Sequence, residues 1–250
     1  MIISSVQNES ARKYRLLALP LKQGAVTIAG ILTGVGGFIL LLRLAASWYA
    51  DVSYAAGYRL ARAGSYTLAR DSLVRAIAMS PSEPLYHDEL STTLASMTTA
   101  AIEERQDATQ AATWAQQSMS ESDRALTISP RNVNFWKTRT KILYSFSSFN
   151  PDLNKTAIDA LNNAQMLSPT DPKIAYNLAI LWGREGDNGQ AIDILKKAID
   201  LKPNYRDAYY ALFVFYTDTK QAVQAREILT KYLTDVDPND QDFQDRLKQL

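Results

Sequence analysis

The chain has 250 residues, no cysteine, one histidine and a formal net charge of +1 at neutral pH. This composition excludes a disulfide framework, a thiolate site and a metal centre built from several histidines. The near balance of charge gives no indication of nucleic-acid binding. The charge is unevenly distributed, however, because residues 1–43 carry five basic side chains and one acidic one. We therefore expect a basic N-terminal segment over residues 1–22.

Residues 23–42 contain no charged side chain and are bracketed by Lys22 and Arg43. As a helix, this segment is about 30 Å long, which matches the hydrocarbon core of a bilayer. The sequence predicts a transmembrane helix over residues 23–46, with Trp48 and Tyr49 at the membrane interface. The alternative is a cleaved signal peptide, although such peptides have a shorter basic start and an apolar run of about 7–15 residues. Cleavage would release a soluble, secreted protein.

The charges that flank this segment predict its orientation. Four basic residues precede it, while Arg43, Arg59 and Arg62 follow at increasing distance. The positive-inside tendency therefore places the N-terminus in the cytoplasm and the remainder of a single-pass membrane protein on the other side. Gly30 and Gly34 have the spacing of closely packed membrane helices, but glycine is also common in membrane helices without such a role.

A phrase typical of a helix end recurs five times after the apolar segment. Each copy ends in a proline, namely Pro81, Pro130, Pro169, Pro203 and Pro238. These prolines follow one another at intervals of 49, 39, 34 and 35 residues. In the first four copies an alanine stands five residues before the proline. A period near 34 is typical of paired helices that stack into a solenoid. Residues 50–250 resemble the tetratricopeptide repeat (TPR) family in this phrase. The resemblance implies an all-α fold, a right-handed TPR α-solenoid of about five helix pairs preceded by one transmembrane helix.

The expected solenoid covers residues 47–239, and residues 240–250 are expected to form a capping helix with Phe243, Leu247 and Leu250 facing inward. The repeat units are 50–83, 84–132, 133–171, 172–205 and 206–239. The second unit is too long, and its excess is expected to lengthen both helices because no proline or glycine interrupts it. The excess of the third unit falls in a turn-rich loop. In the fifth unit Lys220 and Gln221 replace the glycine turn, which weakens that corner.

In the TPR family the first helix of each pair lines a concave groove. Carried over by position, the resemblance implies a partner-binding groove of nine residues: Asn134, Lys137, Lys141, Lys173, Tyr176, Asn177, Ile180, Arg184 and Tyr210. Cationic and amide donors beside aromatic rings suit a carboxylate-bearing peptide or an acidic glycan. The alternative is that these lysines are ordinary solvated positions. The two-carboxylate clamp of some TPR modules is matched only partly, because Asp207 and Ala211 stand where it needs basic residues.

The sequence contains no G-x-S-x-G motif, P-loop, metal-spaced His/Glu set or dinucleotide fingerprint, so we expect no enzyme activity, no cofactor and no metal. His87 has acidic neighbours in Asp88 and Glu89, but adjacent helical residues do not face each other. His87 also occupies a position that holds Trp136 or Tyr209 in other units. We therefore expect it to be a packed side chain rather than a catalytic base.

The junction between span and repeats carries a second resemblance. Residues 47–91, with a Tyr/Ala/Gly-rich helix and the sequence Glu83-Pro84-Leu85-Tyr86, are similar to the region after the last membrane helix of bacterial O-antigen ligase/polymerase-like proteins. The chain lacks the many spans that precede this region in that family. Our main prediction is a membrane-anchored scaffold of the bacterial envelope that binds a protein or peptide through its groove, with an acidic partner among the candidates. The alternative is an accessory or detached TPR tail of a glycan-transferring membrane protein, with a glycan-assembly membrane protein as partner.

Overall fold

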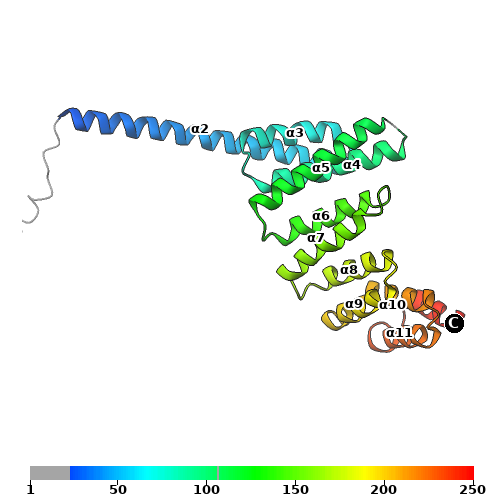
Figure 1. The fold of residues 1–250 in the computed structure, drawn as a ribbon. Helices are drawn as coiled ribbons and strands as arrows, with labels where there is room; N and C mark the ends of the chain where they lie inside the picture. Colours follow the sequence, from blue (N-terminus) through cyan, green and yellow to red (C-terminus); the bar gives the residue numbers. More distant parts are fainter. Residues whose placement is uncertain (1–22, 106) are drawn as a thin grey trace, which may run out of the picture. The chain divides into compact units, whose positions relative to one another are not determined.

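The computed structural model describes residues 23–105 and 107–250, which form an array of helices. Eleven helices, labelled α2 to α12, and no strand occur in these residues (Figure 1). The predicted all-α solenoid with one apolar N-terminal helix is confirmed. The chain divides between Tyr49 and Ala50 into two units. The predicted basic segment, residues 1–22, lies outside the described residues.

The first described helix, α2 (Gln23–Arg62), has 40 residues. Its part from Ala25 onward is long and apolar enough to cross a membrane, and none of its most apolar stretch is buried. Val26, Leu32 and Phe38, for example, are all more than half exposed. Such a helix is compatible with a membrane span and with the apolar core of a signal sequence. The predicted boundary between span and solenoid, at residues 46 and 47, falls inside α2 rather than at a break.

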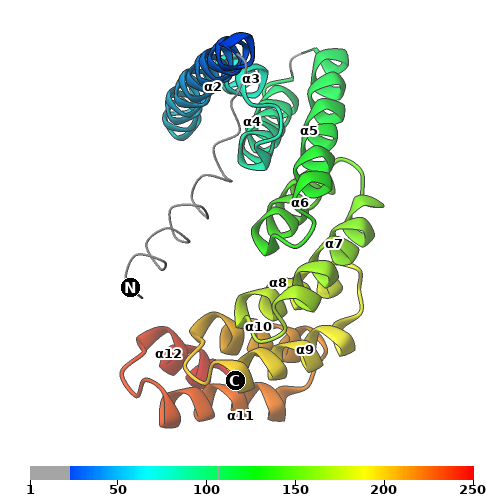
Figure 2. The same ribbon diagram turned by 90° about the vertical axis from the view of Figure 1, so that its left-hand side faces the viewer.

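Residues 50–250 form successive helix pairs and one final helix. The first pair consists of residues 50–62 of α2 and of α3 (Tyr66–Met79). The pairs that follow are α4 (Pro84–Glu103) with α5 (Ala108–Ile128), α6 (Val133–Phe146) with α7 (Leu153–Leu167), α8 (Pro172–Arg184) with α9 (Asn188–Leu201), and α10 (Arg206–Asp218) with α11 (Ala222–Asp235), before α12 (Gln241–Gln249). From α4 onward the first helix of each pair lies on the inner side of a curved row and the second on the outer side (Figure 2).

The local sequence explains where these helices begin and how closely they pack. Asp171 accepts a hydrogen bond from the backbone N–H of Lys173 at 2.9 Å, and Pro172 opens α8, as predicted. The same kind of side-chain cap precedes other helices, at Asp107, Asn132, Asp187 and Asp240. The alanines of the recurring phrase are fully buried, and their small size lets paired helices approach closely; they are Ala76, Ala125, Ala164 and Ala198.

The two long units extend the fold in different ways. In the second unit α4 has 20 residues and α5 has 21, whereas the solenoid helices α6 to α11 have 13 to 15. The predicted lengthening of both helices is therefore confirmed. In the third unit the extra residues lie between Phe146 and Leu153, in the loop where they were expected.

The turn of the fifth unit differs from two others in its residue type. Gly64 and Gly186 adopt φ values of 78° and 87°, and Lys220 has a φ of 61° at the corresponding turn. This left-handed region costs a residue with a Cβ about 1–2 kcal/mol. Replacing the glycine with lysine therefore strains this corner, in agreement with the expectation that it is weaker.

We expect Lys220→Gly to raise the free energy of unfolding by about 0.5–1 kcal/mol. Relief of the left-handed strain outweighs the added freedom of glycine in the unfolded chain. Denaturant unfolding in detergent measures the change. The control is Lys231→Gly within α11, where glycine in a helix interior should lower stability by about 1 kcal/mol. A loss of stability in both variants would show that the corner is unstrained.

The C-terminal helix α12 closes the solenoid. Phe243 is 0% exposed, and its ring centroid lies 4.2 Å from that of Tyr232 on α11. Leu247 packs against the same hydrophobic core, but Leu250 is 39% exposed. The predicted inward face is thus correct for Phe243 and Leu247 and wrong for Leu250, because α12 ends at Gln249 and the last residue leaves the helical face.

Candidate functional site

Helices α6, α7 and α8 enclose a pocket of about 340 Å³. It brings together five of the nine predicted groove residues, namely Lys137, Lys141, Tyr176, Asn177 and Ile180. The sequence reasoning did not select the other lining residues, Thr140, Tyr144, Leu161 and Leu181. Thr140 and Tyr144 follow Lys137 and Lys141 by three residues, so the helical period was a signal that could have found them.

The spacing of residues along α6 and α8 accounts for the pocket. Lys137 and Lys141 are one turn apart on α6, and Tyr176 and Ile180 are one turn apart on α8, so each pair lies on one helical face. Leu161 of α7, only 1% exposed, belongs to the hydrophobic core and contributes an apolar wall. The pocket therefore combines an apolar interior with ammonium, amide and phenol groups.

The two lysines of the pocket have different environments. Lys137 Nζ donates to the carboxylate of Asp171 at 3.2 Å. Burial by itself would raise the pKa of Asp171, but the Lys173 N–H and the Lys137 ammonium lower it below its usual value. Lys141 is exposed and forms no ion pair with any described residue. Lys141 is therefore the more available cation for a ligand.

Aromatic side chains surround the lysines. The Arg184 guanidinium lies 4.8 Å from the ring centroid of Tyr144, which places this predicted residue at the border of the pocket. The ring of Tyr176 lies 5.4 Å from that of Tyr205. Burial raises the pKa of Tyr176, and the charge of Asp207 raises it further. Tyr176 therefore remains a neutral phenol that can donate a hydrogen bond at neutral pH.

Asn134 and Lys173 do not line the pocket. They lie in the first turns of α6 and α8 with exposed side chains. Their backbone N–H groups are bonded by the helix caps Asn132 and Asp171. These two predicted site residues lie near the groove, but the pocket itself does not contain them.

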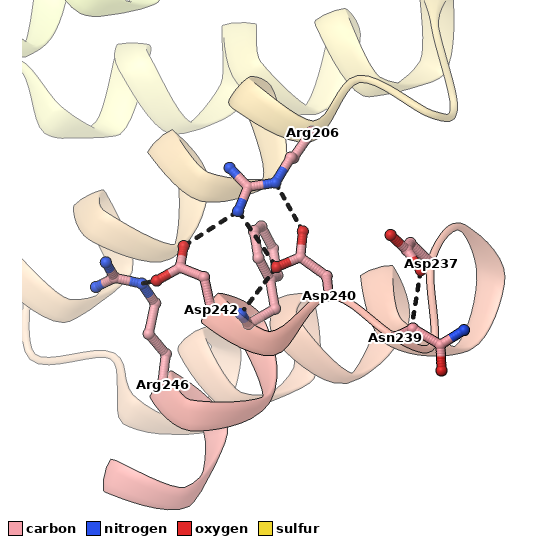
Figure 3. A network of polar contacts seen from close by, with 7 residues as sticks. Arg206, Asp237, Asn239, Asp240, Asp242 and Arg246 are labelled. Atoms are coloured by element: carbon pink, nitrogen blue, oxygen red, sulfur yellow. Dashed lines mark hydrogen bonds and ion pairs between the residues drawn. The ribbon is translucent and has the colours of Figure 1, made fainter.

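Tyr210 also lies apart from this pocket, because α12 covers it. The Arg246 guanidinium is 4.7 Å from the centroid of the Tyr210 ring. A network of charges, in which Arg206 bonds Asp240 at 2.7 Å and Arg246 bonds Asp242 at 2.9 Å, holds α12 in place (Figure 3). The sequence did not reveal this cover because it depends on α12 packing back on α10.

A second set of polar residues lies on α4. Asp88 Oδ2 accepts a hydrogen bond from the Thr138 hydroxyl of α6 at 3.2 Å, while Asp88 Oδ1 is buried without a partner among the described residues. Burial raises the pKa of Asp88 to about 7, the Thr138 bond lowers it, and the neighbouring Glu89 raises it. Glu89 is only 9% exposed, and burial also raises its pKa. The sequence singled out neither carboxylate as a groove residue.

His87 is packed, as predicted. It is 5% exposed, with Nδ1 at 2.6 Å from Glu121 Oε2 on α5 and Nε2 at 3.0 Å from the carbonyl oxygen of Pro81. Both ring nitrogens are thus used to join α4 to its neighbours. Among the described residues, no three His, Cys, Asp or Glu side chains are placed to hold a metal ion.

We expect Asp88→Asn to change how stability depends on pH. Because folding raises the pKa of Asp88, the folded protein binds this proton more tightly, and stability present below about pH 4 is lost as the pH rises towards 7. Relative to the variant, the wild type should lose on the order of 1–2 kcal/mol over this range, after discounting for solvent screening. Unfolding free energies measured from pH 4 to 8 test this expectation. Parallel pH profiles for the two proteins would contradict it.

Comparison with known proteins agrees with the helical array. A tetratricopeptide repeat model matches residues 184–250. No curated protein sequence matches the chain. Among solved structures, Pseudomonas aeruginosa pilF is 17% identical over 76% of this chain and 78% of its own, with a TM-score of 0.58. MamA from Desulfovibrio magneticus RS-1 is 18% identical over 78% and 97%, with a TM-score of 0.59.

A third solved structure, YrrB, is described as a TPR protein with an unusual peptide-binding site. It is 17% identical over 79% of this chain and 91% of its own, with a TM-score of 0.55. Identities this low establish a common fold and no more. Residues 184–250 thus match a tetratricopeptide repeat model, and the described helical array shares the fold of solved TPR structures such as YrrB.

Proposed function

We propose that the chain is a membrane-tethered scaffold that holds a segment of a partner protein in the pocket between α6 and α8. The observation that carries the proposal is the pocket itself, in which Lys141 is an unpaired cation beside Tyr176 and Asn177. A volume of about 340 Å³ admits one or two side chains of an extended segment rather than a folded domain. The peptide-binding site named for YrrB, a protein of the same fold, supports this type of partner.

The chemistry of the pocket favours an acidic segment. An ammonium group and an amide bind a carboxylate by charge-assisted hydrogen bonds, and the apolar interior accepts the adjacent side chain. Lys137 contributes less, because Asp171 already neutralises it at 3.2 Å. We therefore assign Lys141 the main electrostatic contribution, with Asn177 and Tyr176 orienting the ligand.

The exposed apolar part of α2 supports membrane tethering. Its side chains from residue 25 to 44 are exposed, which suits lipid and is unfavourable in water. We place the N-terminus in the cytoplasm and the repeats outside, in a bacterial envelope, on the basis of the flanking basic residues. Tethering would raise the effective concentration of the scaffold near membrane-bound partners. The mass of the mature protein separates this proposal from signal cleavage, and accessibility of single introduced cysteines on either side of the membrane tests the orientation.

Charge reversal at Lys141 should weaken partner binding about tenfold, because the new carboxylate would repel an acidic segment. We would photo-crosslink partners through a reactive group placed at Asn134, solubilise the membranes in detergent, and compare the yield from wild type and Lys141→Glu. Lys155→Glu on the outer helix α7 is the matched control, since it makes the same change at another exposed lysine. Equal yields from wild type, Lys141→Glu and Lys155→Glu, in proteins with equal unfolding temperatures, would contradict the proposal.

The similarity to O-antigen ligase/polymerase-like proteins remains a prediction from the sequence. It is tested by reading the coding sequence upstream of Met1. Further apolar spans in the same reading frame would favour the detached-tail alternative over an independent scaffold.

A further inference from the structure

Asp88 and Glu89 are consecutive on α4, and neither carboxylate forms an ion pair with a described residue. Glu89 is 9% exposed, and its carboxylate makes no hydrogen bond or ion pair with another described residue and is not among the fully buried unpaired atoms. Its tip therefore reaches the protein surface from a largely buried side chain. Beside it, Asp88 has one bonded oxygen and one buried oxygen without a partner. A buried carboxylate without a partner is costly, so this arrangement favours an external cation.

The surroundings suit an organic cation. Tyr54 of α2 lies close enough for the charges of Glu89 and Asp88, together with burial, to raise its pKa to about 12. Its ring stacks on Tyr86 at 5.0 Å and lies 6.2 Å from Tyr58, so the carboxylates border an aromatic cluster. Carboxylates next to aromatic rings attract lysine and arginine side chains. A metal ion fits less well, because the described residues provide no third His, Cys, Asp or Glu ligand.

The lysine and arginine side chains that influence the pKa of Glu89 form no ion pair with either carboxylate. Arg62 affects the pKa of Glu89, but its guanidinium lies 4.7 Å from the centroid of the Tyr58 ring instead of pairing with a described carboxylate. Lys141 also lowers the pKa of Glu89 without forming an ion pair in the described part of the chain. The stacking of Arg62 on Tyr58 shows that the aromatic cluster accepts a guanidinium.

Helix α6 links the two carboxylates to the basic pocket, because it carries a residue that bonds Asp88 and residues that line the pocket. Thr138 bonds Asp88, and Lys141 follows three residues later on the same helical face, where such residues have their Cβ atoms about 5–6 Å apart. An extended segment advances about 3.3 Å per residue. One short segment can thus reach both places, with its cationic and acidic side chains about two to four residues apart.

From this arrangement we infer that Asp88, Glu89 and Tyr54 form a subsite for a lysine or arginine side chain of the partner segment whose acidic group binds at Lys141. The inference rests on the proposed function and adds a second, oppositely charged contact to it. The ligand is therefore a segment with charges of both signs in a fixed order. The matching opposite charges also fix the direction in which the segment lies along the groove.

The test uses the full chain in detergent and a displayed library of random ten-residue peptides. Selection on the wild type is compared with selection on a double variant, Asp88→Asn with Glu89→Gln, which keeps side-chain size and removes both charges. The matched control is Asp193→Asn with Glu227→Gln, on the exposed faces of the outer helices α9 and α11. Unfolding temperatures confirm that all three proteins are folded.

The inference predicts enrichment of lysine or arginine about two to four residues from an aspartate or glutamate on the wild type and on the control. In peptides selected on the Asp88/Glu89 variant, the enrichment of lysine and arginine should disappear, while the enrichment of aspartate and glutamate remains. Changing the basic residue of a selected peptide to norleucine should weaken wild-type binding about tenfold and leave binding to that variant unchanged.

The remaining outcomes overturn specific claims. If peptides selected on the wild type are enriched in acidic residues but not in basic residues, this inference is overturned and the proposed function is left intact. Basic enrichment that persists on the Asp88/Glu89 variant also overturns the inference, because the cation then binds elsewhere. If peptides selected on the wild type are no richer in charged residues than peptides selected on Lys141→Glu, both the inference and the proposed function are overturned.

Discussion

Phe243→Ala is expected to lower the free energy of unfolding by about 3 kcal/mol. Phe243 is completely buried, and large-to-small substitutions of buried phenylalanine cost about 3–5 kcal/mol. Its ring contacts Tyr232 and lies 5.0 Å from the Arg206 guanidinium, so its loss leaves a cavity and weakens the charge network of Figure 3. The lower end of the range applies because α12 is terminal and can detach before the rest unfolds.

Thermal unfolding and hydrogen exchange together measure this effect. The unfolding temperature should fall, and the amides of α12 should lose protection first. Leu250→Ala is the control within the same C-terminal segment, because Leu250 is 39% exposed and its loss should change stability by less than about 0.5 kcal/mol. Unchanged protection of α12 in Phe243→Ala would show that Phe243 does not hold the cap.

Gly57→Ala is the second substitution with a large expected effect. A Cβ at this position would lie 2.7 Å from Leu73 Cγ and 3.1 Å from the backbone oxygen of Ala69. Leu73 is fully buried, so α2 and α3 must separate to admit the methyl group. Overpacking of this kind costs about 1–3 kcal/mol, and it opposes the gain of about 1 kcal/mol that alanine brings to a helix. We expect a net loss of about 1–2 kcal/mol.

The matched control for this substitution is Gly189→Ala in α9. A Cβ at Gly189 would meet only Asp187 Oδ1 at 3.6 Å, which is an ordinary contact. This variant should therefore be as stable as the wild type or more stable by up to about 1 kcal/mol. Denaturant unfolding of both variants separates crowding at Gly57 from the general effect of replacing glycine. Equal gains in both would mean that α2 and α3 are not closely packed there.

Much of the groove was predictable because a helix places residues by a fixed period. Lys137 and Lys141, like Tyr176 and Ile180, are four residues apart, and the repeat phrase identifies α6 and α8 as adjacent first helices. This is enough to bring the four residues to one pocket. Tyr210 lies outside this pocket, and Arg246 of α12 lies 4.7 Å from the centroid of its ring. No local period specifies how a terminal helix folds back.

The charges of the groove required the three-dimensional structure. The sequence counts Lys137 and Lys141 as equivalent cations, whereas the fold pairs Lys137 with Asp171 and leaves Lys141 unpaired among the described residues. In the sequence Asp88 and Glu89 are noted only as the acidic neighbours of His87. In the fold Glu89 is only 9% exposed, and one oxygen of Asp88 is buried without a partner among the described residues. Burial and pairing depend on neighbours from other units, so they are tertiary properties.

The sequence by itself determined the all-helical class, the repeat phrase with its buried alanines, the lengthened second unit and the exposed apolar character of α2. These features depend on residue period, small residues and helix-ending prolines, which act within one helix pair. The tertiary structure decided which charges are paired, which ring α12 covers, and that the carboxylates of Asp88 and the largely buried Glu89 lack an ion-pair partner among the described residues. Those outcomes arise where helices of different units meet, and the repeat pattern does not encode the side chains at such contacts.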